Sequence, residues 1–216
     1  MNNTLLTAEG DENRINEDDI ANDMAFPELK VFGYTALFAP LLFTVMWIMS
    51  AAIDGSWQFG VNSLSDMGIS QNAISAFLFN SGCIITGIFG MFVGFGMFLY
   101  GKRTLTVGGI VYIIGMFFLS LVGVFTLHQS MHYVVSTAFG LITALAVAIS
   151  SLSDWKVSWY LYADIILAAV AIVAVATQPF EMWESITTIT SLIWISIFGI
   201  KVMKGEGELF NDRARI

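Results

Sequence analysis

The chain has 216 residues, of which 56% are hydrophobic and only 12% are charged, and its mean hydropathy is +0.76. Ordinary soluble domains carry roughly a quarter charged residues, so the composition excludes a soluble domain and predicts a single-domain integral membrane protein. The net charge of -8 argues against nucleic acid as a partner. The single cysteine, Cys83, excludes an intramolecular disulfide.

The first segment, residues 1–30, is polar and strongly acidic. Its carboxylates are Glu9, Asp11, Glu12, Glu17, Asp18, Asp19, Asp23 and Glu28. Low hydrophobicity with an excess of like charge predicts a disordered tail. We expect the membrane domain to cover 31–203 and a short second tail to cover 204–216.

Six apolar runs follow the tail, each long enough to cross about 30 Å of hydrocarbon. They cover 31–53, 74–100, 105–125, 132–153, 157–177 and 184–203. The third and fourth are separated by 126–131, because a histidine such as His128 would be costly in lipid. The sequence therefore predicts an all-α bundle of six transmembrane helices joined by short loops.

Basic residues indicate the orientation of the bundle, since cytoplasmic loops are enriched in Lys and Arg. All nine fall on one side of the six spans: Arg14, Lys30, Lys102, Arg103, Lys156, Lys201, Lys204, Arg213 and Arg215. This asymmetry predicts a multi-pass protein of the cell membrane with both termini in the cytoplasm. The loops 54–73, 126–131 and 178–184 would then lie outside, and membrane lipids would be partners of the chain.

The second span is rich in glycine, with Gly82, Gly87, Gly90, Gly94 and Gly96. The step from Gly90 to Gly94 permits two helix backbones to approach closely. Packing within the chain is one use of such a surface. The alternative is a homo-oligomer or a membrane complex assembled through this helix.

The side chains best suited to chemistry adjoin the three outer loops. They share a position at one predicted membrane boundary: Ser65, Asp66, His128, His132, Glu181 and Glu184. Ionisable residues at such depths are candidates for a functional site. Whether these side chains converge depends on how the helices pack.

The two histidines are four residues apart, so both imidazoles would project from one helix face if this stretch were helical. Together with Asp66 and Glu184, His128 and His132 could hold a divalent metal such as zinc. A metal-bound water would then serve as a hydrolytic nucleophile. The alternatives are histidines hydrogen-bonded to neighbouring carboxylates or carbonyls, or histidines that titrate or bind substrate.

The turn around Ser65, Asp66 and Gly68 has two interpretations. Short polar side chains cap helices and turns, and Gly68 would permit a positive φ. Alternatively, Asp66 is a ligand or proton acceptor beside the histidines, assisted by Ser65 or Ser136. Asn80 lies within the second span, where a buried amide either hydrogen-bonds between helices or forms part of a functional site that binds a cofactor.

Asp164 differs from the other carboxylates, because the fifth span places it toward the cytoplasmic side. It therefore needs a partner of its own. Tyr160, one turn earlier, is close enough to donate a hydrogen bond, or the carboxyl group is neutral.

Several short motifs together resemble a known family. They are Ser-Leu-Ser-Asp-Met-Gly at 63–68, Phe-Asn-Ser-Gly at 79–82, Gly-Val-Phe at 123–125, His-Tyr-Val-Val-Ser at 132–136, Glu184, Trp194 and Gly-Ile-Lys at 199–201. Over roughly 31–203 the chain resembles the prokaryotic, largely archaeal six-helix membrane family known as domain of unknown function nine-nine-eight. The resemblance implies that Asp66, Asn80, His132 and Glu184 are family positions and that His128 is an addition of this chain.

A more distant similarity is to the ceramidase and progestin-receptor-like membrane hydrolases, which hold zinc with Ser, Asp and three His at a membrane boundary. This chain departs from them with six helices rather than seven and two histidines rather than three. The similarity is an analogy in the chemistry of the site.

Two functions follow from these patterns. The first is a membrane-embedded hydrolase or transferase that acts on a lipid at the outer leaflet through Asp66, His128, His132 and Glu184. The second is a non-enzymatic membrane protein, either a binder of lipid or small solute or an accessory subunit of a membrane complex. The sequence leaves open which of the two applies.

Overall fold

The computed structural model describes residues 27–154 and 158–204. In these ranges the chain is all-helical, and six helices are long and apolar enough to cross a membrane. They are α2 (Pro27–Asp54), α3 (Ala73–Tyr100), α4 (Thr104–Val124), α5 (Met131–Ser151), α6 (Ser158–Thr177) and α7 (Phe180–Met203), with short 3-10 helices η1 (Leu64–Ile69) and η2 (Leu152–Asp154). The predicted fold class is confirmed.

Most helix ends lie within two residues of the predicted spans, and two helix starts differ by four residues. The first helix begins at Pro27 rather than at 31, so residues 27–30 of the predicted tail are helical. The last helix begins at Phe180 rather than at 184, directly after Pro179, whose fixed φ suits the start of a helix. Residues 1–26 and 205–216 of the predicted tails lie outside the described residues, as does Lys156.

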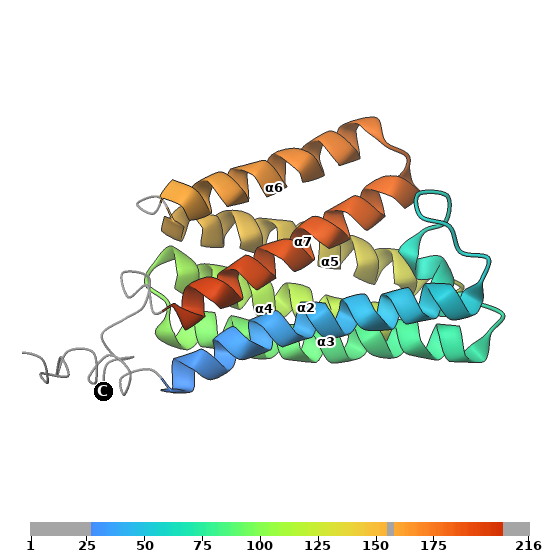
Figure 1. The fold of residues 1–216 in the computed structure, drawn as a ribbon, viewed down its shortest axis with the longest axis horizontal. Helices are drawn as coiled ribbons and strands as arrows, with labels where there is room; N and C mark the ends of the chain where they lie inside the picture. Colours follow the sequence, from blue (N-terminus) through green and yellow to red (C-terminus); the bar gives the residue numbers. More distant parts are fainter. Residues whose placement is uncertain (1–26, 155–157, 205–216) are drawn as a thin grey trace, which may run out of the picture.

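Successive helices run antiparallel, so each end of the bundle gathers sequence-distant segments (Figure 1). We call one end the basic end, because all five described Lys and Arg residues lie there: Lys30, Lys102, Arg103, Lys201 and Lys204. The opposite end carries η1 and the carboxylates of Asp54, Asp66, Glu181 and Glu184, and we call it the capped end. The cytoplasmic placement of the basic end stays a prediction.

Three glycines of α3 pack against α4, whereas Gly82 and Gly96 lie against side chains of α2. A Cβ atom added to Gly87 would lie 2.6 Å from the carbonyl oxygen of Met116, and one added to Gly109 would lie 2.7 Å from that of Gly94. Only a helix pair without side chains at these points can approach so closely. These glycines are used within the chain, so another chain would have to displace α4 to reach them.

The outermost helices are α5 and α6. The contacts of α5 are mainly with α4, and those of α6 are mainly with α7, which in turn packs against α2. Figure 1 shows α5 and α6 near one another at the basic end and diverging toward the capped end. The position of α6 is therefore fixed mainly by α7 and by its own first turns.

Candidate functional site

The segment between α2 and α3, residues 55–72, folds over the capped end of the bundle, and we call it the cap. Its 3-10 helix is closed by reciprocal hydrogen bonds between two side chains and two backbone amides. The backbone N–H of Ser63 donates to Oδ2 of Asp66 at 2.8 Å, and the N–H of Asp66 donates to Oγ of Ser63 at 3.2 Å. This capping box satisfies donors that a helix start leaves open, so Asp66 has the structural use that its sequence context allowed.

The start of the cap is fixed by Asp54, the last residue of α2. Its Oδ1 accepts hydrogen bonds from the backbone N–H groups of Ser56 at 3.0 Å and Trp57 at 2.8 Å. Its Oδ2 accepts from the hydroxyl of Ser70 near the other end of the cap. The indole N–H of Trp57 donates to the carbonyl of Ser63 at 2.8 Å. One carboxylate thus holds both ends of the cap together.

Glu184, in the second turn of α7, ties this helix to the cap. Its Oε2 accepts from the backbone N–H of Leu64 at 2.7 Å, and its Oε1 accepts from the hydroxyl of Ser65 at 3.2 Å. Ser65 is only 6% exposed. These bonds join residues about 120 positions apart in the sequence and bring Ser65, Asp66 and Glu184 into one cluster.

Asn80 holds the end of η1 against α3. Its side-chain amide donates to the carbonyl of Gly68 at 2.9 Å. The glycines with positive φ among the described residues are Gly55 and Gly60, so the expectation of a positive φ at Gly68 was wrong. Gly68 is needed for close approach instead, because a Cβ atom there would lie 2.5 Å from Oδ1 of Asn80.

The two histidines do not share a helix face. Residues 127–130 form turns, and α5 begins only at Met131, so the helical condition on which their pairing depended is not met. His128 is exposed on the turn, whereas His132 is buried at 4% exposure. The Nδ1 atom of His132 lies 2.7 Å from the carbonyl oxygen of Phe125, which can only accept, so this nitrogen donates.

The predicted metal ligands are not brought together. Across residues 27–154 and 158–204, no three His, Cys, Asp or Glu side chains are placed to share a metal ion. The set of His128, His132, Asp66 and Glu184 therefore does not fit a metal site in this arrangement. Ser136 is engaged in its own helix, with its hydroxyl donating to the carbonyl of Tyr133 at 3.3 Å.

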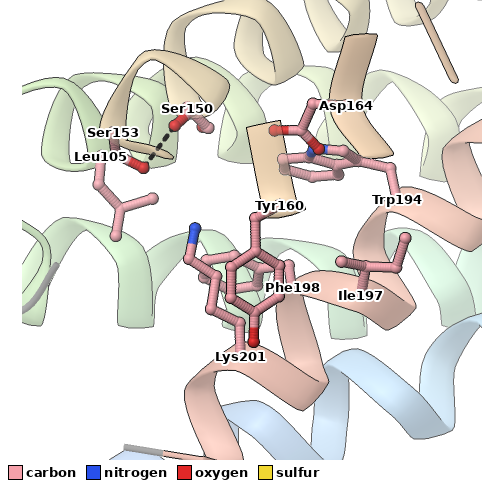
Figure 2. Close-up of a pocket in the computed structure, with 9 residues that line it drawn as sticks. All are labelled: Leu105, Ser150, Ser153, Tyr160, Asp164, Trp194, Ile197, Phe198 and Lys201. Carbon is pink, nitrogen blue, oxygen red and sulfur yellow. Dashed lines mark hydrogen bonds between the residues drawn. The ribbon is translucent and has the colours of Figure 1, made fainter. Parts of the chain in front are cut away.

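A second polar site lies at the basic end, in a small cavity of about 10 Å³. It is lined by residues of α4, α5, η2, α6 and α7: Leu105, Ser150, Ser153, Tyr160, Asp164, Trp194, Ile197, Phe198 and Lys201. Figure 2 shows the amine of Lys201 between Leu105 and Tyr160, with Asp164 beside Trp194. Asp164 is 8% exposed and Lys201 is 2% exposed, so both ionisable groups are buried.

Comparison with known families shows where the chain belongs. The sequence profile of a family described as "Protein of unknown function (DUF998)" matches residues 37–201. The chain belongs to this family. No curated protein and no solved structure matches it.

The region matched by the DUF998 profile contains both polar sites. It includes the whole cap, Asn80, His132 and Glu184, and it ends at Lys201, the last residue of the cavity lining. The family resemblance inferred from the short motifs is therefore confirmed. It carries no activity, because the family is one of unknown function.

Lys201 is the site residue that the sequence analysis missed, since it was used only to orient the bundle. A signal for it does exist in the sequence. Trp194, Phe198 and Lys201 follow one another at spacings of four and three, which place them on one helix face, and all three are buried. A lysine on an apolar stripe inside a membrane span indicates a functional candidate with a buried partner.

Proposed function

We propose that this DUF998 protein is a non-enzymatic membrane protein that binds a lipid acyl chain. The proposal is supported first by the state of the candidate catalytic residues. Asp66, Asn80, His132 and Glu184 each make a hydrogen bond to a backbone group that closes the capped end. Side chains committed to backbone groups in this way stabilise a fold, and they need no substrate to explain them.

The observation that carries the proposal is an apolar groove of about 540 Å³ on α2 and α3. Its lining is Val31, Tyr34, Thr35, Leu37, Phe38, Leu41 and Phe89, and it includes none of the candidate catalytic residues. The groove is shallow and open rather than enclosed, a shape that suits a flexible chain lying along a helix face. The groove lies along the basic-end half of α2, within the span predicted to cross the bilayer. Lipid acyl chains surround such a span, so an acyl chain is the ligand that this groove would meet.

A groove-filling substitution tests the proposal against a matched control. Leu41, 62% exposed, lies in the groove, and Leu141, 69% exposed, lies on the lipid-facing side of α5. Leu41→Trp places a bulky side chain in the groove and should lower the amount of lipid that co-purifies by several-fold, measured by native mass spectrometry. Leu141→Trp should carry the same lipid as wild type. Equal lipid retention by both variants and wild type would show that the groove is not a binding site.

A second candidate function, the lipid hydrolase, is favoured by the pair of Ser65 and Glu184. A hydroxyl donating to an oriented carboxylate is the arrangement of an activated nucleophile, and the N–H of Leu64 orients this carboxylate. Burial of Ser65 weighs against access by a substrate. If the protein is a lipid hydrolase, Ser65→Ala should leave stability nearly unchanged and alter the lipid composition of the cell. The lipid-binding proposal predicts that the lipid composition stays unchanged.

A further inference from the structure

The cavity at the basic end is lined by a residue whose buried hydroxyl has no hydrogen-bond partner in the described part of the chain. The Oγ atom of Ser150 makes no hydrogen bond within the described part of the chain, although Ser150 is only 3% exposed. The neighbouring bond in Figure 2 uses another atom, since Ser153 Oγ donates to the backbone carbonyl of Ser150 at 2.6 Å. A buried hydroxyl without a partner costs roughly 1–3 kcal/mol, so the arrangement calls for an additional group.

The size and chemistry of the cavity restrict what that group can be. Its volume of about 10 Å³ is close to the roughly 10–15 Å³ needed for one water molecule. Its lining offers one carboxyl group, from Asp164, and one amine, from Lys201, together with the hydroxyl-bearing Ser150 and Ser153. This lining has no excess of acidic or basic groups, so it favours a neutral ligand over an ion.

We propose that this cavity is an internal hydration site that holds one ordered water molecule against Ser150 Oγ. A water with several polar neighbours is a persistent part of a structure and is costly to remove. Here it would connect α5, through Ser150, with the polar side chains of α6 and α7. The hydration site thus lies where the first turns of α6, which carry Tyr160 and Asp164, pack against the rest of the bundle.

The sign of a stability change distinguishes a hydrated cavity from an empty one. If water is bound, Ser150→Ala removes a satisfied hydrogen bond and should lower the Tm of the purified full-length protein by about 2–4 °C. If the cavity is empty, the same substitution removes an unsatisfied buried hydroxyl, and Tm should stay unchanged or rise. An unchanged or raised Tm would therefore overturn the proposal.

Thr143 supplies the control, because its Oγ1 is also buried without a hydrogen-bond partner among the described residues but does not line the cavity. Thr143→Val keeps the side-chain volume and should not lower Tm. A density map that resolves ordered water gives an independent readout. A peak within hydrogen-bonding distance of Ser150 Oγ is expected, and a cavity without density would overturn the proposal.

Discussion

The two ends of the bundle place polar residues in different ways. At the capped end, carboxylates, an amide and a histidine satisfy backbone groups of the cap and of the neighbouring helix ends. At the basic end, Lys201 and Asp164 are buried around a cavity between four helices. The polar side chains of the capped end have backbone partners close by, whereas at the basic end the hydroxyl of Ser150 is buried without a hydrogen-bond partner among the described residues.

This difference shows that the number of polar residues is a poor guide to function. A chain that turns at the boundary of a membrane exposes backbone groups to an apolar environment, and each must find a partner. Asp, Asn, Ser and Glu are the residues that supply such partners. A lysine buried on an apolar face of a membrane span is rarer than such caps, so it is also a candidate for a specialised site.

The largest expected effect is at Glu184. Glu184→Ala leaves the N–H of Leu64 and the hydroxyl of Ser65 without their acceptor, so we expect the free energy of unfolding to fall by about 3 kcal/mol. Glu181→Ala is the control, because Glu181 lies about one turn earlier in the same helix and would lose a favourable interaction with the helix dipole of under about 1 kcal/mol, partly offset by relief of its repulsion with Glu184. Equal stability of the two variants in denaturant titrations would contradict the structural role of Glu184.

An intermediate effect is expected at the histidines. His132→Ala leaves the carbonyl of Phe125 unpaired and opens a buried space, which should cost about 2 kcal/mol. His128→Ala removes an exposed side chain and should change stability by less than about 0.5 kcal/mol. Thermal unfolding of the two variants separates the roles. A shared role in metal binding would instead make both losses similar, and both would depend on added metal.

The smallest effect is expected for a basic residue at the surface. The Nζ atom of Lys204 lies 6.0 Å from the ring centroid of Trp159, and such exposed contacts contribute about 0.5 kcal/mol. Lys204→Met should therefore reduce stability by no more than this, measured by denaturant titration at low salt. If Lys204→Met lowered the free energy of unfolding as much as Glu184→Ala, the polar contacts of the basic end would stabilise the fold as strongly as those of the capped end.

The six helices could be predicted from the sequence because each one is a continuous apolar run of bilayer length. The count of six spans also predicted that the basic residues lie at the opposite end from the loops 54–73, 126–131 and 178–184. Helix ends were harder, since Phe180 and Glu181 are compatible with either loop or helix. Pro179 is the N-cap of α7, and the enrichment of proline at helix starts is a local signal that apolar periodicity does not contain.

The candidate site was predictable only in part. Capping by Asp66 and hydrogen bonding by Asn80 were among the alternatives, because side-chain chemistry limits what such residues do at a turn. The histidine pair failed because its geometry depended on the backbone at 127–130, which forms turns. The contact of Glu184 with Leu64 and Ser65 could not be predicted, since it depends on how α7 packs beside the cap.

We propose that the polar residues of the capped end stabilise the fold and do not carry out chemistry. The most direct test measures Tm and the lipid composition of the expressing cells together for wild type, Asp66→Ala and His132→Ala. We predict lower Tm values for both variants and an unchanged lipid composition. Variants with the Tm of wild type and an altered lipid composition would contradict the claim.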